Sequence, residues 1–302
     1  MNFLLVGAAF GACAFAAGWL IGLLVSSSVP RQVKRRSARA AFILGIAPLL
    51  VAVAAVVALV GPAFLIYEPR DTRELPGFVL LVGSAVGCAL LLRTTFRLIR
   101  IALASRRLIR EWTRHATPLT SIKVMPAMAI DTGHPVVVVA GLTRAALYID
   151  RRVLETCSDD ELDAIAAHEL AHVESADNVK RLMLAATRGP THTLVTCWRD
   201  AAELDADRFA ATDERRGLAL ASALVKVARA ATSPQLDALA ASSVHDGGDV
   251  ERRVQALLRP RPPQGRLRGA AATVIAIALV ALAPLGWKST YEAMELLVSY
   301  LP

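Results

Sequence analysis

The stretch HELAH, at residues 168 to 172, holds the side chains best suited to chemistry in this chain. Residues four apart on a helix share one face, with β-carbons about 5 to 6 Å apart, so His168 and His172 can reach one metal ion. Glu169 can face a water molecule on the open side of that ion. The pattern therefore predicts a metal site that activates water. The alternative is a chance match on an amphipathic helix.

A catalytic zinc ion usually has three protein ligands and one position left for water. A third histidine six residues after the second is absent, because Ser175 and Asn178 stand where that extended motif needs glycine and histidine. Glu174 is a poor substitute, since it lies two residues past His172 and faces another direction. The third ligand must therefore come from another segment.

The best candidate for that ligand is Glu203, in the segment AAELDADRFA. If this segment is a helix packed antiparallel to the HELAH helix, Glu203 returns towards the two histidines. Asp207, one turn later, could then hold a ligand histidine through its second ring nitrogen. The alternative is that Glu203, Asp205 and Asp207 form a solvated acidic face.

Helices are predicted to position these residues. Ser158 and Glu161 have capping-box spacing, and neither proline nor glycine intervenes before Gly189, which predicts one long helix through HELAH. A second helix is expected from about Thr193 to near Gly217. Two more are expected in LALASALVKVARAA and DVERRVQALL.

Short β-branched runs precede the long helix: SIKVMPAMAI, HPVVVVAG and AALYID. Proline, glycine and aspartate interrupt them, which is typical of a small antiparallel sheet. The preceding segment, LIRIALASRRLIREW, either continues a membrane span or lies along the inner membrane surface. Together these elements predict one α+β domain over residues 100–268.

The rest of the chain is typical of a membrane protein. Of its 302 residues 55% are hydrophobic and only 20% are charged, and the mean hydropathy is +0.46. Four segments approach the roughly 20 apolar residues that a spanning helix needs: residues 4–25, 40–66, 77–96 and 269–287. The first is expected to be an uncleaved anchor, because no basic residue precedes it and VPRQVKRR follows it.

Basic residues predict the orientation of these spans. They gather in the loop at residues 31–39, after the third span and before the fourth, and basic connections are retained in the cytoplasm. We therefore expect three membrane helices in residues 1–99, a cytoplasmic domain at 100–268, and a fourth helix with a short external tail at 269–302. This describes a multi-pass protein of the cell membrane with both termini outside.

The net charge of +8 fits this arrangement, because basic clusters at membrane borders favour anionic lipid. The lipid bilayer is thus the first expected partner, and no direct nucleic-acid binding is expected. The alternatives are a nucleic-acid contact by RQVKRRSAR and a proline-recognising partner for RPRPPQGR. The sequence is compatible with an oligomer.

HExxH followed by a helix with Glu-x-x-x-Asp resembles the gluzincin metalloproteases that carry a catalytic domain on membrane helices. Two groups fit, the BlaR/MecR-type signal-transducing peptidases and the HtpX and CAAX prenyl protease group. Three spans, a domain and one further span are similar to the BlaR/MecR arrangement, and the likeness is strongest over residues 158–210. The external β-lactam-binding sensor domain of the better-known transducers is expected to be lacking, since the sequence ends at Pro302.

The resemblance implies an α+β gluzincin domain with one zinc ion per chain, held by His168, His172 and Glu203. It implies that Glu169 is the general base and that Asp207 supports a ligand. The segment PVVVVAGLTRAALYID looks like the one that supplies an edge strand for an extended substrate.

The segment SSVHDGGDVERRVQALL is also similar to a part of HtpX-like proteins in which a histidine precedes an arginine-bearing helix. This likeness implies His245 or Arg252 as a donor to the oxyanion of the reaction. The alternatives are a loop histidine and a surface charge.

The function predicted from these features is that of a membrane zinc endopeptidase that cleaves a cytoplasmic or membrane-proximal protein, with a repressor in a signalling pathway as one candidate. A protease for quality control of membrane proteins is an alternative. A third reading, from another class, is a receptor or scaffold with a structural zinc site. Such sites usually have four protein ligands, and the nearby Cys157 and Cys197 lack motif spacing.

Overall fold

The computed structural model describes residues 3–28, 37–69, 77–141, 145–231, 247–259 and 286–299. Three helical segments are long and apolar enough to cross a membrane: Phe3–Ser28, Ala38–Tyr67 and Phe78–His115. They correspond to the first three predicted spans, so the protein is membrane-associated. The predicted fourth span, residues 269–287, lies outside the described residues up to position 285.

The first two apolar segments are α1 (Phe3–Ser28) and a composite helix of α3 (Ala38–Ala54), the π-helical turn η1 (Ala55–Val60) and α4 (Gly61–Tyr67). They cross closely where α1 carries glycine. A β-carbon at Gly18 would lie 2.7 Å from the Cα of Ala52, and one at Gly22 would overlap the backbone of Pro48. Small residues therefore determine how the membrane helices pack.

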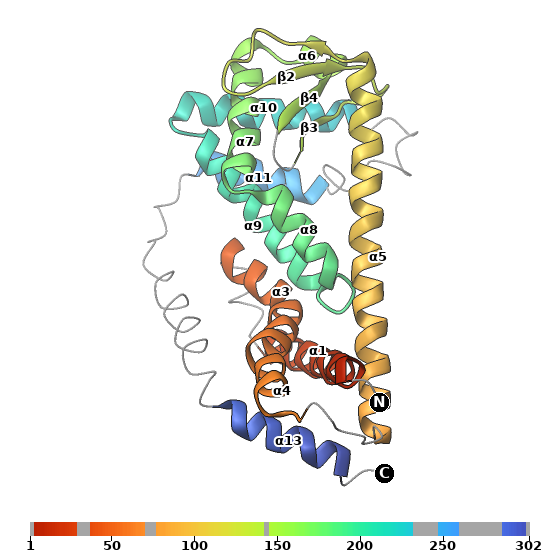
Figure 1. Cartoon of the computed structure of the whole chain (residues 1–302). Coiled ribbons are helices and arrows are strands. Elements are labelled where there is room, and N and C mark those ends of the chain that lie inside the picture. The colour runs from red at the N-terminus through yellow and green to blue at the C-terminus, as the bar shows by residue number, and fades with distance from the viewer. Residues whose placement is uncertain are drawn as a thin grey trace.

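The third helix, α5 (Phe78–His115), has 38 residues and is about 57 Å long at 1.5 Å per residue. It runs beside α1 at its lower end and reaches the sheet at its upper end (Figure 1). The segment LIRIALASRRLIREW is thus a continuation of the third span and does not form a separate surface helix. This one helix links the two ends of the molecule.

The sheet contains β1 (Thr117–Pro118), β2 (Ala127–Ile130), β3 (Val137–Ala140) and β4 (Ala146–Asp150), in the order β1-β2-β4-β3. The β2–β4 pair is parallel and the other two pairs are antiparallel. The prediction of an antiparallel sheet is therefore wrong, and the sheet is mixed. The reason lies at Asp150, whose carboxylate accepts hydrogen bonds from the backbone N–H and hydroxyl of Thr132, so that β2 and β4 end side by side.

The predicted long helix is also wrong, because it is two helices. After α6 (Arg151–Thr156), α7 (Asp159–Glu174) begins with the predicted capping box of Ser158 and Glu161. The chain then turns through Ala176, which has a left-handed φ of 54°, and α8 (Asp177–Thr187) follows in a new direction. Neither glycine nor proline marks this turn, which is why the sequence pattern did not reveal it.

The next helices are α9 (His192–Ala210), α10 (Glu214–Ala231), α11 (Gly247–Leu258) and α13 (Trp287–Ser299). The second predicted helix was expected to reach Gly217, but α9 ends at Ala210. Asp213 explains the break, because its side chain accepts a hydrogen bond from the N–H of Arg216 and caps the start of α10.

Two of the apolar clusters hold together the end of the molecule that carries the sheet. One packs the sheet against α6, α7 and α10 around Leu147, Ile149 and Ile165. The other packs α3 against α8 and α9, where Leu184 fills the space beside Gly45 and the hydroxyl of Thr187 donates to the carbonyl of Gly45. A membrane helix is thus in direct contact with α9, the helix that carries Glu203.

Candidate metal centre

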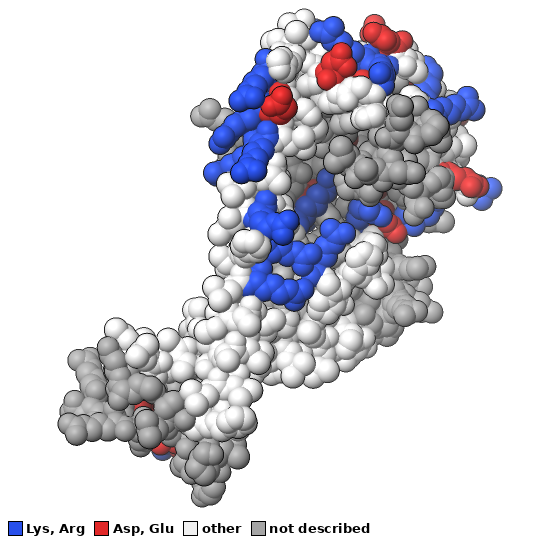
Figure 2. Space-filling model, turned by 90° about the vertical axis from the view of Figure 1, so that its right-hand side faces the viewer, with Lys and Arg blue, Asp and Glu red and all other residues white. Residues whose placement is uncertain are grey.

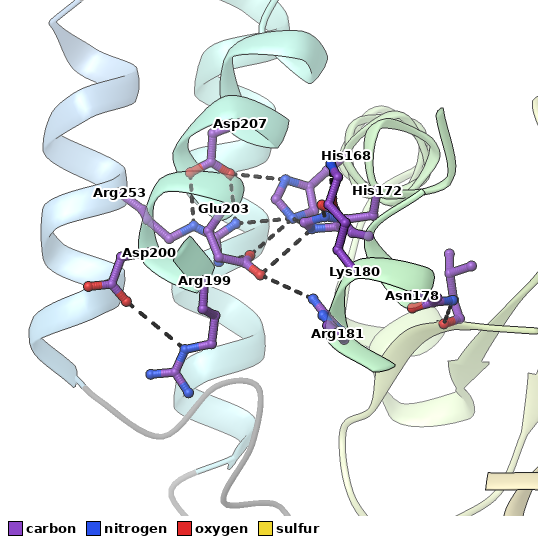
Figure 3. A network of polar contacts seen from close by, with 12 residues as sticks. His168, His172, Asn178, Lys180, Arg181, Arg199, Asp200, Glu203, Asp207 and Arg253 are labelled. Atoms are coloured by element: carbon purple, nitrogen blue, oxygen red, sulfur yellow. Dashed lines mark hydrogen bonds and ion pairs between the residues drawn. The ribbon is translucent and has the colours of Figure 1, made fainter. Parts of the chain in front are cut away.

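Three side chains from α7 and α9 converge at one point (Figure 3). The Nε2 atoms of His168 and His172 lie 3.3 Å apart. The Glu203 carboxylate approaches both, with Oε2 3.4 Å from Nε2 of His168 and Oε1 3.7 Å from Nε2 of His172. Both histidines are buried, and these three residues form a group that could hold a metal ion. The structure therefore brings together the three residues that the sequence predicted as ligands.

The spacing of these atoms fits a tetrahedral zinc ion. Two ligands at about 2.0 to 2.1 Å from zinc in tetrahedral geometry are about 3.4 Å apart. The three separations of 3.3, 3.4 and 3.7 Å are close to that value. Two imidazoles and one carboxylate are also the donor set of many catalytic zinc sites, which leaves a fourth position for water.

Each histidine has a carboxylate at its other ring nitrogen. Oδ2 of Asp177 lies 2.8 Å from Nδ1 of His172, and Oδ1 of Asp207 lies 3.0 Å from Nδ1 of His168. The first contact has hydrogen-bond geometry, whereas in the second the ring N–H points off the line to the oxygen. Such carboxylates hold a proton on Nδ1 and leave the Nε2 lone pair free for a metal.

Sequence reasoning named Asp207 for this position but missed Asp177. An acidic residue five positions after the second histidine would point away on a continuous helix. It returns to His172 only because the chain turns at Ala176. One sequence signal for the turn was present. Aspartate is typical of a helix N-terminus, and Asp177 stands in the middle of a stretch that otherwise has a helical pattern.

Arg253 of α11 is a further residue that sequence reasoning missed. Its Nε and Nη2 atoms donate to both oxygens of Asp207, at 2.8 and 2.7 Å, and Nη1 lies 3.1 Å from Oε2 of Glu203. Nη2 also lies 3.3 Å from Nε2 of His168. The guanidinium therefore lies against two of the three converging side chains, Glu203 and His168.

The two predicted oxyanion donors have different outcomes. The structure does not bring Arg252 into the site: its side chain is 47% exposed and lies 3.6 Å from Asp200. One step along a helix rotates a side chain by about 100°, so Arg253 faces the ligands instead. His245 lies outside the described residues.

Burial and charge together set the protonation of the site. Burial would lower the pKa of His172, but hydrogen bonds to Asp177 and Glu203 outweigh it and raise that pKa to about 9. Burial would raise the pKa of Glu203, but hydrogen bonds from both histidines and the charge of Arg253 hold it well below its usual value. The site thus attracts positive charge, which either protons or a metal cation can supply.

A cavity of about 100 Å³ opens beside these ligands. Glu169 lines it, half-buried, on the same helix as the histidines. The edge strand β3 lines another side with Val137, Val138 and Val139, and Asn178 and Arg181 of α8 line a third. The cavity therefore has room for a small part of a substrate next to both the ligands and a sheet edge.

Comparison with protein-family models finds one match over residues 107–273, to the model described as peptidase family M48. The matched region exceeds half of the chain, and it includes the three converging ligands together with Glu169, Asp207 and Arg253. A search of the curated proteins found no match.

Proposed function

The chain belongs to peptidase family M48, a family of zinc-dependent metallopeptidases, and we propose that it is a membrane-bound zinc endopeptidase. The observation that carries this proposal is the approach of Glu203 to within 3.7 Å of both imidazole nitrogens. In this assignment His168, His172 and Glu203 hold one zinc ion per chain. Asp177 and Asp207 orient the two imidazoles.

A zinc ion bound there would lower the pKa of a water molecule towards 7 and polarise the scissile carbonyl. Glu169 would act as the general base, taking a proton from the attacking water and passing it to the leaving nitrogen as the peptide C–N bond breaks. Arg253, already paired with Asp207, keeps its charge beside the ligands and stabilises the negative charge that develops on the carbonyl oxygen. This role replaces the one suggested by the sequence for Arg252.

The substrate is proposed to be a protein segment in extended conformation. Strand β3 stands at the edge of the sheet and lines the cavity. An edge strand can bind a peptide through main-chain hydrogen bonds, while side-chain pockets supply selectivity. The apolar lining from Ile165, Leu220 and Leu224 favours an apolar substrate side chain.

The membrane helices are proposed to hold this site on the cytoplasmic side. Among the described residues on the face in Figure 2, lysine and arginine gather over the upper part of α5, and the lower part is apolar. Basic segments stay in the cytoplasm, so the N-terminus of α1 would lie outside. The domain limits 1–99, 100–268 and 269–302, with a fourth span, belong to the same proposal.

Two cellular roles are consistent with this site. The three spans before the domain favour a BlaR/MecR-like transducer that cuts one cytoplasmic protein, such as a repressor. A quality-control protease would cut many membrane proteins. Quantitative proteomics of cells with and without active enzyme separates them, because the first role predicts one accumulating substrate and the second predicts dozens.

The test of the proposed chemistry is Glu169→Gln in the detergent-purified chain loaded with zinc. We expect peptide cleavage to fall by about 10²- to 10⁴-fold, the usual contribution of a general base, while the zinc content stays at one per chain. Glu174→Gln is the matched control, since Glu174 is exposed on the same helix. Unchanged cleavage by the Glu169 variant would contradict the mechanism.

A further inference from the structure

The free edge of β3 presents a defined row of backbone groups. The N–H of Asp150 donates to the carbonyl of Val136 at 2.8 Å. This bond shows which residues of β3 have backbone groups that face β4. In an antiparallel pair, residues whose N–H and carbonyl bond to the partner strand alternate with residues whose N–H and carbonyl point away from it. Val138, opposite Tyr148, bonds to β4, so the N–H and carbonyl groups of Val137 and Val139 point away from β4. These outward groups are the ones that an added strand would meet.

Asn178 already occupies part of this row. Its side-chain Nδ2 donates to the carbonyl of Val139 at 3.2 Å and to the carbonyl of Gly141 at 3.1 Å. An amide nitrogen has two hydrogens, and both are used here. Among the described residues, the outward groups of β3 left for a substrate are the N–H and carbonyl of Val137 and the N–H of Val139.

The position of Asn178 follows from the turn that also builds the metal centre. Asn178 is the second residue of α8, directly after Asp177, which holds His172. It lines the same cavity as the ligands and β3, and in Figure 3 its amide nitrogen faces the strand. The turn at Ala176 thus places one side chain on the metal-binding histidine and the next on the substrate strand.

We infer that Asn178 is a positioning residue: by capping the carbonyls of Val139 and Gly141 it leaves the carbonyl of Val137 as the acceptor on β3 for a backbone N–H of an extended substrate. This inference rests on the proposed peptidase function. A substrate N–H opposite Val139 finds its acceptor already taken, whereas one opposite Val137 is free to bond. Asn178 therefore limits the hydrogen bonds that β3 can make to a substrate strand to those of Val137 and of the N–H of Val139.

The test uses a peptide that the enzyme cleaves, in which each backbone N–H is replaced by an ester oxygen, one position at a time. For the wild-type enzyme we expect one replacement, opposite Val137, to lower kcat/KM by up to about tenfold. For Asn178→Ala we expect a second sensitive position two residues away, opposite the released carbonyl of Val139. Val179→Ala, an exposed neighbour, is the matched control.

The outcomes separate this inference from the proposed function. Cleavage that does not depend on Glu169 would remove the peptidase assignment itself. Glu169-dependent cleavage with the same ester profile in the Asn178→Ala variant would overturn only the role of Asn178. If that variant does not fold, the wild-type profile still decides, because two sensitive positions spaced by two residues contradict a capped strand.

Discussion

The membrane helices and the catalytic end of this protein are held together by different kinds of contact. Along the described parts of α1, α3, α4 and α5, the buried polar residues are Ser26 and Thr94, and the helices meet at glycines. At the catalytic end the buried polar residues form linked pairs: Asp177 with His172, Asp207 with Arg253. The first region therefore depends on shape and the second on matched charge.

This difference predicts different consequences of substitution. In the bundle, an added methyl group changes packing and lowers stability, but leaves the chemistry of the distant site intact. At the catalytic end, an isosteric change that removes one charge leaves the shape intact and changes metal binding. Substitutions in each region test whether stability and metal binding respond independently.

The largest effect is expected for Glu203→Ala, which removes one of the three proposed ligands. Zinc affinity should fall by more than about 100-fold, beyond the 10- to 100-fold typical of losing a residue that only orients a ligand. Competition with a chelator of known affinity measures it. Asp205→Ala is the control, because its side chain is 60% exposed on the same helix. Equal zinc affinity in the two variants would exclude Glu203 as a ligand.

A smaller effect is expected for Asp177→Asn. The amide keeps the size of the side chain but removes the charge that holds the ring of His172, so zinc affinity should fall by about 10- to 100-fold. The same titration measures it, and circular dichroism should show an unchanged helix content. A loss of folding without a specific loss of zinc would mean that Asp177 serves the turn at Ala176 alone.

In the bundle, Gly18→Ala should lower the free energy of unfolding in detergent by about 1 to 3 kcal/mol, the usual range for overpacking. The added methyl group would meet the backbone of Ala52. Gly11→Ala is the matched control on α1, since its added β-carbon would lie 3.8 Å from the nearest side-chain atom of Val56. Both variants should keep the zinc affinity of the wild type at temperatures where they are folded. A loss of zinc affinity in folded Gly18→Ala would instead reveal coupling through α3 and α9.

The pH dependence of zinc binding should follow His172. Its pKa is raised to about 9 in the metal-free protein, so below that pH the ring carries a proton that zinc must displace. Zinc affinity should therefore rise with pH by at least about tenfold per unit until that pKa is passed, because the pKa of His168 is raised too. Calorimetry in two buffers of different ionisation enthalpy measures the released protons. Binding without proton release at pH 7 would contradict the protonation assigned to the site.

The site could be predicted from sequence where it depends on helical periodicity. His168 with His172, and Glu203 with Asp207, are each spaced by four, so a local rule places both pairs on one face. Asp177 and Arg253 depend on non-local features, namely a left-handed turn at Ala176 and the packing of α11 on α9. Asp177 is the one residue whose type hints at the turn, and no pattern of residue types marks the packing of α11 on α9.

The fold, too, could be predicted where it depends on local sequence patterns. Hydropathy located the three apolar helices, and the capping box located the start of α7. The parallel pairing of β2 with β4 was missed because strand order depends on how the β3–β4 hairpin folds back, which Asp150 helps to fix. The helix breaks at Ala176 and Asp213 were missed because alanine and aspartate are compatible with a helix.

The most direct test of the metal centre is X-ray absorption spectroscopy at the zinc edge, on the zinc-loaded chain and its Glu203→Ala variant. A site built from His168, His172 and Glu203 should show only nitrogen and oxygen neighbours near 2.0 to 2.1 Å, two of them imidazoles. In the variant the oxygen shell should change while both imidazoles are retained. A sulfur neighbour near 2.3 Å, or identical spectra from the two proteins, would contradict it.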